Sequence, residues 1–101
     1  MVVVERMIQR IRPDKWAELE AIDKKYDVVE SRLGFPAKKR YQCIIGGHDT
    51  NTLIVERQWE SFAVMEATYE KAFADPEHQA LGQEGIPIIK STQIEVYMPL
   101  P

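Results

Sequence analysis

Few side chains of the kinds that usually do chemistry occur in this sequence, and they are scattered. His48 and His78 lie far apart without a spaced set of carboxylates, so we expect no metal site. His48 next to Asp49 would suit a general base oriented by a carboxylate, but we favour a turn residue beside an Asx-type turn former. Cys43 is the single cysteine and falls in a predicted strand, so we expect a buried, unreactive thiol.

Arg57 and Trp59 are the pair best suited to binding a small molecule. Two positions apart in a predicted strand, their side chains should point the same way, toward the helices. An arginine can hold a carboxylate, phenolate or quinone oxygen, and a tryptophan supplies a flat apolar wall. The alternative is core packing, with the arginine stem buried and its head reaching water. Glu56 directly precedes Arg57 and should face the opposite side of the sheet, so we expect no ion pair between Glu56 and Arg57.

The elements that must position these residues can be predicted from hydrophobic spacing. The predicted strands are residues 2–11, 39–45, 52–59 and 90–98, and the predicted helices are residues 13–33 and 61–73 with a short third helix to about residue 85. Asp75 and Pro76 suit the N-cap and first position of the short helix. Trp16, Tyr26 and Phe73 fall on apolar helix faces and are expected in the core.

The order β-α-β-β-α-β predicts a single α+β domain over residues 1–101, ferredoxin-like, with a four-stranded antiparallel sheet and its helices on one face. Glu5, Glu56 and Glu95 are expected together on the other face. That face can be wet, or it can form a polar dimer interface in which the carboxylates find partners. A catalytic carboxylate pair is the third alternative.

Composition restricts the classes of partner. The 101 residues carry a formal net charge of -3, which argues against binding to nucleic acid or to an anionic membrane. The short basic cluster at residues 38–40 is expected to be a solvated strand entry. One cysteine excludes an internal disulfide, and the apolar start is too short for a signal peptide or a membrane span, so we expect a cytoplasmic protein.

Residues 33–81, about half the chain, resemble the NIPSNAP-like branch of the dimeric α/β-barrel superfamily, which also holds antibiotic-biosynthesis-type monooxygenases. The resemblance rests on four motifs: Gly-Gly-x-Asp-x-Asn-x-Leu at residues 46–53, Glu-Arg-x-Trp at 56–59, Ser-x-x-x-x-Glu at 61–66 and Asp-Pro-Glu at 75–77. These motifs are mostly structural, so they specify the fold better than an activity.

The resemblance implies a homodimer in which two sheets close face to face into a barrel. It also implies a pocket between each sheet and its helices for a small hydrophobic or aromatic molecule, lined here by Arg57, Trp59, Tyr69 and His78. Haem-degrading relatives present an iron ligand from this helical region, but His78 falls early in the short helix and Leu81 takes the inward place, so no cofactor is implied. The alternatives are a cofactor-free monooxygenase-like enzyme acting on an aromatic substrate and a purely structural dimer.

Overall fold

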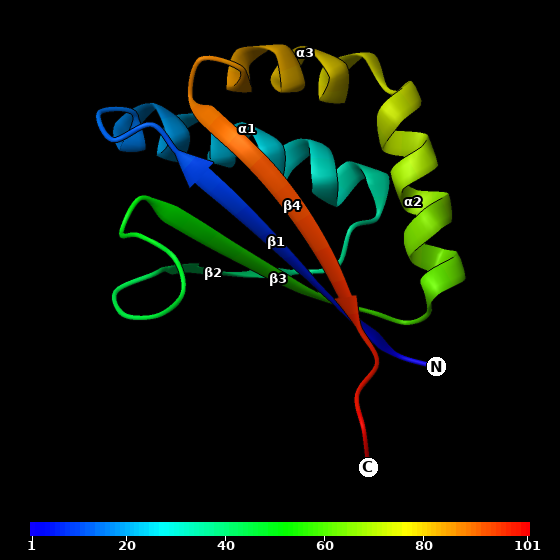
Figure 1. Cartoon of the computed structure of the whole chain (residues 1–101). Coiled ribbons are helices and arrows are strands. Elements are labelled where there is room, and N and C mark those ends of the chain that lie inside the picture. The colour runs from blue at the N-terminus through cyan, green and yellow to red at the C-terminus, as the bar shows by residue number, and fades with distance from the viewer.

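A computed structural model describes all residues 1–101 as a two-layer α+β domain. The elements in chain order are β1 (Val3–Ile11), α1 (Trp16–Leu33), β2 (Lys38–Gln42), β3 (Thr52–Trp59), α2 (Phe62–Ala74), α3 (Pro76–Gly85) and β4 (Ile89–Tyr97) (Figure 1). The shortest dimension of the backbone is 17 Å, which leaves room for one sheet and one layer of helices. The predicted ferredoxin-like fold is confirmed.

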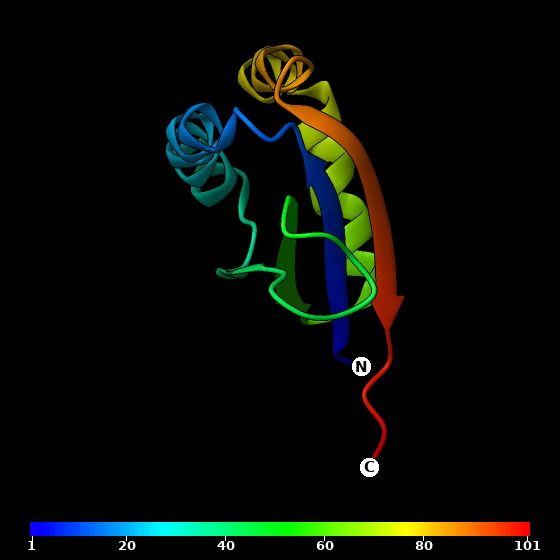
Figure 2. The same cartoon turned by 60° about the vertical axis from the view of Figure 1, so that its left-hand side comes forward.

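The four strands form one antiparallel sheet in the order β2-β3-β1-β4, so β2 and β4 are its edges. Figure 2 shows the sheet from its side, with α1 standing off one face and the β2–β3 loop curling around the near end. The register places Arg6 opposite both Glu56 and Glu95, and Glu5 opposite Arg57. Because directly opposed residues share a face, this register decides which side chains meet the helices.

The helix ends follow ordinary capping chemistry. The hydroxyl of Ser61 accepts a hydrogen bond from the Val64 amide at 3.1 Å, and the Asp75 carboxylate accepts one from the His78 amide at 3.0 Å. The start of α1 differs from the prediction, because Pro13 lies in a turn and the helix begins at Trp16. Gly34 ends α1 in the left-handed conformation, with φ of 91°.

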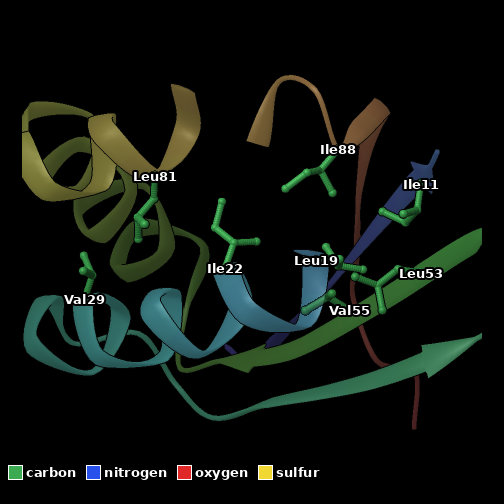
Figure 3. Packing of buried hydrophobic residues seen from close by; sticks show 8 residues of the cluster. All are labelled: Ile11, Leu19, Ile22, Val29, Leu53, Val55, Leu81 and Ile88. Carbon is green, nitrogen blue, oxygen red and sulfur yellow. The ribbon is translucent and has the colours of Figure 1, made fainter. Parts of the chain in front are cut away.

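The core lies between the sheet and the helices. Its main cluster combines three residues of α1 with residues from β1, β3 and α3 and from the turn before β4: Ile11, Leu19, Ile22, Val29, Leu53, Val55, Leu81 and Ile88 (Figure 3). Trp16 and Tyr26 pack against this cluster, as predicted. A smaller cluster of Val3, Trp59 and Met65 seats α2 on the sheet. The prediction for Phe73 was wrong, since this ring is 66% exposed.

The connection between β2 and β3 is longer than predicted. β2 ends at Gln42, so Cys43 lies outside the strand, where it is half-buried and its thiol donates to the carbonyl of His48 at 3.3 Å. Asp49 accepts a hydrogen bond from the Asn51 amide at 2.9 Å, which is the Asx turn expected there. The exposed residues Ile44 and Ile45 occupy the loop instead of extending the strand.

The basic cluster at the start of β2 is not the solvated entry that we predicted. The Lys38 side chain is only 10% exposed, and its Nζ lies 2.7 Å from Asp23 Oδ1. Arg40 lies against α1 as well, with Nη2 2.8 Å from Glu20 Oε1. The alternation of the strand turns Lys38 and Arg40 toward acidic residues of α1, and only Lys39 between them faces away.

Two glycine-to-alanine substitutions should have effects of opposite sign on the free energy of unfolding. Gly34→Ala should lower it by about 1–2 kcal/mol, because an alanine in the left-handed region is strained. Gly82→Ala should raise it by about 0.5–1 kcal/mol, because Gly82 lies inside α3 and a Cβ there meets nothing within 4 Å. Urea unfolding at one protein concentration measures both, and the same sign for both variants would contradict the assigned helix boundaries.

Candidate functional site

Glu5 lies on the helix-covered face of the sheet, which corrects the sequence prediction. It is directly opposite Arg57 on β3 and is 1% exposed, whereas Glu56 and Glu95 lie on the open face as expected. The residues of β1 alternate between two equally mixed sets, so apolar content alone did not show which set was covered. The pairing of Glu5 with the buried Arg57 on β3 decides which face of the sheet Glu5 occupies.

The buried Glu5 carboxylate is satisfied by two neutral donors. The Trp59 indole Nε1–H donates to Oε1 at 2.9 Å, and the Tyr69 hydroxyl donates to Oε2. These donors come from the end of β3 and from the middle of α2, so one carboxylate joins three elements. A buried carboxylate without such partners would be strongly destabilising, which explains why a tryptophan is found at this strand end.

Arg57 carries the compensating positive charge. Its side chain is 3% exposed, with Nη2 2.6 Å from Glu30 Oε2 on α1 and Nη1 3.9 Å from Glu5 Oε1. The guanidinium also lies over the ring of Phe35, 5.0 Å from its centroid. Arg57 therefore faces the helices, as predicted, and forms no ion pair with Glu56, which binds Arg6 instead at 2.8 Å.

The ion pairs continue outward from Arg57 as an alternating chain. Glu30 Oε1 lies 3.1 Å from Lys38 Nζ, which in turn lies 2.7 Å from Asp23 Oδ1. Although burial opposes the charge on Lys38, hydrogen bonds to Asp23 and the charge of Glu30 raise its pKa overall. Negative and positive groups alternate from the interior to the edge of α1.

A cavity of about 190 Å³ lies beside this chain of ion pairs, between the sheet and the helices. Five rings surround it: Tyr26, Phe35, Tyr69, Phe73 and His78. Phe35 meets the ring of Tyr69 edge-on at 5.2 Å and lies parallel to the His78 ring at 6.4 Å between centroids. The walls are mostly apolar, with a few polar groups in fixed positions, as small-molecule sites usually are.

The structure brings together three of the four residues predicted from the sequence. Arg57, Tyr69 and His78 line the cavity, whereas Trp59 is 1% exposed and lies behind it against Glu5. Sequence reasoning missed several lining residues, among them Phe35, Lys38, Glu30 and Asp23. The i, i+7 spacing of Asp23 and Glu30 on one helix face was a readable signal, since it places two carboxylates toward the same strand.

The two tyrosines and the histidine at the cavity are held in their neutral forms. Burial and the hydrogen bond to Glu5 raise the pKa of Tyr69 far above its usual value, so its hydroxyl stays protonated. Burial also raises the pKa of Tyr26 and lowers the pKa of His78. A neutral imidazole at pH 7 offers one donor and one acceptor nitrogen to the cavity. The backbone amide of His78 donates a hydrogen bond to the Asp75 carboxylate, but the His78 ring makes no hydrogen bond.

Two further properties of the chain concern metal binding and membrane spans. No group of three or more His, Cys, Asp or Glu side chains is placed to hold a metal ion. None of the helices combines the length and apolar character that crossing a membrane requires.

Comparison with known proteins identifies the fold. No protein-family model matches the sequence, and no curated protein matches it significantly. An uncharacterized NIPSNAP domain protein from Burkholderia xenovorans has a TM-score of 0.83 at 18% identity, over 97% of this chain and 94% of that one. A NIPSNAP family protein from Agrobacterium tumefaciens has a TM-score of 0.82 at 21% identity, over 98% and 86%.

A third structure links the fold to the monooxygenase-like group. A protein from Chloroflexus aurantiacus described as an antibiotic biosynthesis monooxygenase has a TM-score of 0.64 at 18% identity, over 100% of this chain and 95% of that one. The chain therefore has the fold shared by NIPSNAP-family and monooxygenase-like proteins, as the motifs at residues 46–77 predicted. At these identities the likeness concerns the fold alone.

Removing the Tyr69 hydroxyl should show how strongly the buried carboxylate depends on its donors. Tyr69→Phe leaves one oxygen of Glu5 without a partner, so we expect the free energy of unfolding to fall by about 1–3 kcal/mol. Tyr26→Phe is the matched control, because the Tyr26 hydroxyl makes no hydrogen bond and its loss should cost less than about 0.5 kcal/mol. Equal effects in urea unfolding would show that the Glu5 bond contributes nothing specific.

Proposed function

We propose that this protein is a NIPSNAP-like homodimer that binds a small hydrophobic or aromatic molecule in the cavity between its sheet and its helices. The observation that supports binding most directly is the ring-lined space of about 190 Å³ itself. What marks this space is its lining, in which apolar and aromatic side chains surround a few polar groups, as they do in small-molecule sites. Its volume suits a molecule with a single ring.

The surroundings of the cavity support the same conclusion. The paired charges of Arg57 and Glu30 hold α1 and β3 in place, so the space does not depend on a loop that must close. The exposed ring of Phe73 contacts Tyr69 and His78 at the edge of the cavity, which gives an entering aromatic molecule a surface to stack on. A preformed apolar site binds without a large cost of ordering.

A cofactor-free monooxygenase-like reaction is the second candidate, and the state of His78 favours it. Burial lowers the pKa of His78, so its imidazole is neutral at pH 7, and the ring has no hydrogen-bond partner in the protein, which leaves a nitrogen free to accept the proton of a bound phenol. The resulting phenolate would reduce dioxygen. One oxygen atom would become a quinone oxygen on the ring, and the other would leave as water with the two displaced hydrogens.

The homodimer is supported by the open face of the sheet. Ile54 lies there between the buried Ile8 and the exposed Tyr41, and the loop beside them exposes Ile44 and Ile45 at 83% and 94%. A groove of about 460 Å³ runs over this face. Apolar groups on an uncovered sheet favour a second sheet as the cover. The Arg6–Glu56 pair at 2.8 Å would enter such an interface already neutralised.

Ligand binding can be tested by isothermal titration with 4-methylphenol. We expect saturable binding with one site per chain and its loss in Val55→Phe, since the larger ring would fill the cavity. Val28→Phe is the control, because Val28 is 70% exposed and lies in a separate groove between α1 and α3. Unchanged binding by folded Val55→Phe, or loss in Val28→Phe, would place the site elsewhere.

The dimer can be tested by size exclusion with light scattering. At micromolar concentration we expect twice the chain mass of 11.7 kDa. Ile54→Lys should yield monomers, because it puts a charge at the centre of the open face, while Ile86→Lys at the exposed end of α3 should leave the dimer intact. A wild-type monomer would favour the alternative of a wet sheet face.

The enzymatic candidate can be tested with an oxygen electrode and 2-methylphenol, a single-ring phenol whose para position is free. We expect oxygen uptake that rises with pH through a value below the ordinary pKa of histidine, because only the neutral imidazole accepts a proton. His78→Asn should abolish the uptake, whereas His48→Asn in the exposed loop should not change it. Equal uptake by both variants would remove the assigned role of His78.

A further inference from the structure

We infer that the cavity selects an uncharged aromatic molecule whose carbonyl oxygen accepts a hydrogen bond from Arg57. This inference rests on the proposed function and names the class of ligand. It follows from two features of the lining, which are the balance of its charges and one donor that the protein leaves without a partner.

The charges at the cavity already neutralise one another. Two carboxylates and two cations line it: Asp23, Glu30, Lys38 and Arg57. Glu30 contacts both cations, at 2.6 Å from Arg57 and 3.1 Å from Lys38. An anionic ligand would have to displace Glu30 from Arg57 and leave a carboxylate without its partner, which is costly in a buried site.

Glu5 makes the site still less suitable for an anion. It lies behind the lining with Oε1 3.9 Å from Arg57 Nη1, so the guanidinium is placed between two carboxylates. A cationic ligand is disfavoured for a different reason. Each carboxylate that lines the cavity is already held by a lysine or an arginine, and an ammonium group would have to compete with that partner.

One donor of Arg57 is not used by the protein. Its Nε is buried and has no hydrogen-bond partner in the protein. The Arg57 side chain, which is 97% buried, also lines the cavity. A buried N–H without an acceptor is costly, so a ligand oxygen that accepts from it gains more than an oxygen would gain at the surface. A neutral carbonyl meets this need without adding charge.

Three isosteric phenols separate the possibilities: 4-hydroxybenzamide is neutral, 4-hydroxybenzoate is anionic and 4-hydroxybenzamidine is cationic. Titrated calorimetrically into the full chain at pH 7, the amide should bind about tenfold more tightly than either charged compound. Stronger or equal binding of the benzoate or the benzamidine would overturn the inference while leaving the proposed function intact. Failure of all three and of 4-methylphenol would overturn the proposed function itself.

A charge substitution should change the preference. Glu30→Gln keeps the shape of the side chain but leaves the lining with an excess positive charge, so the benzoate should gain relative to the amide by about tenfold. Glu84→Gln is the control, since it removes an equal charge from the exposed pair with Lys25, and the preference should not change. A preference that is unaffected by Glu30→Gln would show that charge balance does not select the ligand.

The hydrogen bond itself can be observed without a substitution. In a nitrogen-15 spectrum the Arg57 Nε–H signal should move downfield when the amide binds, while the signals of the surface arginines, such as Arg10 and Arg32, stay in place. Binding of the amide without a change in the Arg57 signal would contradict the carbonyl contact.

Discussion

The pairing of Glu5 with Arg57 across β1 and β3 is the constraint on which the interior depends. Two opposed charges buried under the helices must each find hydrogen-bond partners, or the fold loses several kcal/mol. Trp59, Tyr69 and Glu30 supply these partners from β3, α2 and α1. The polar contacts therefore fix how both long helices are positioned over the sheet.

This requirement also accounts for the cavity. Because Arg57 and Glu30 connect the strand to the helix through long side chains, the layer between them is filled unevenly. Phe35 lies against the guanidinium on one side, and the rings of Tyr69 and His78 lie around it. A wholly apolar core at this position would pack shut, so the buried ion pairs and the open space belong together. The cavity is a consequence of how the charges are satisfied.

The architecture was predictable from the sequence because its signals are local. The spacing of apolar residues defines α1, and Asp75 with Pro76 defines the start of α3. That Arg57 and Trp59 face the helices followed from strand alternation, whereas the full burial of the Arg57 head did not, because it depends on Glu30 of α1. The face taken by Glu5 did not, because it depends on register with β3, which is a property of two strands together. The burial of Lys38 was also missed, because it depends on acidic partners from another element, α1.

Whether the space beside Arg57 is a binding site can be tested most directly by a crystal structure of the protein grown with 4-hydroxybenzamide. We expect one ligand per chain among the rings of Tyr26, Phe35 and His78, with its carbonyl oxygen within hydrogen-bond distance of Arg57 Nε. A cavity closed by repacked side chains, at a ligand concentration that saturates binding in solution, would contradict it.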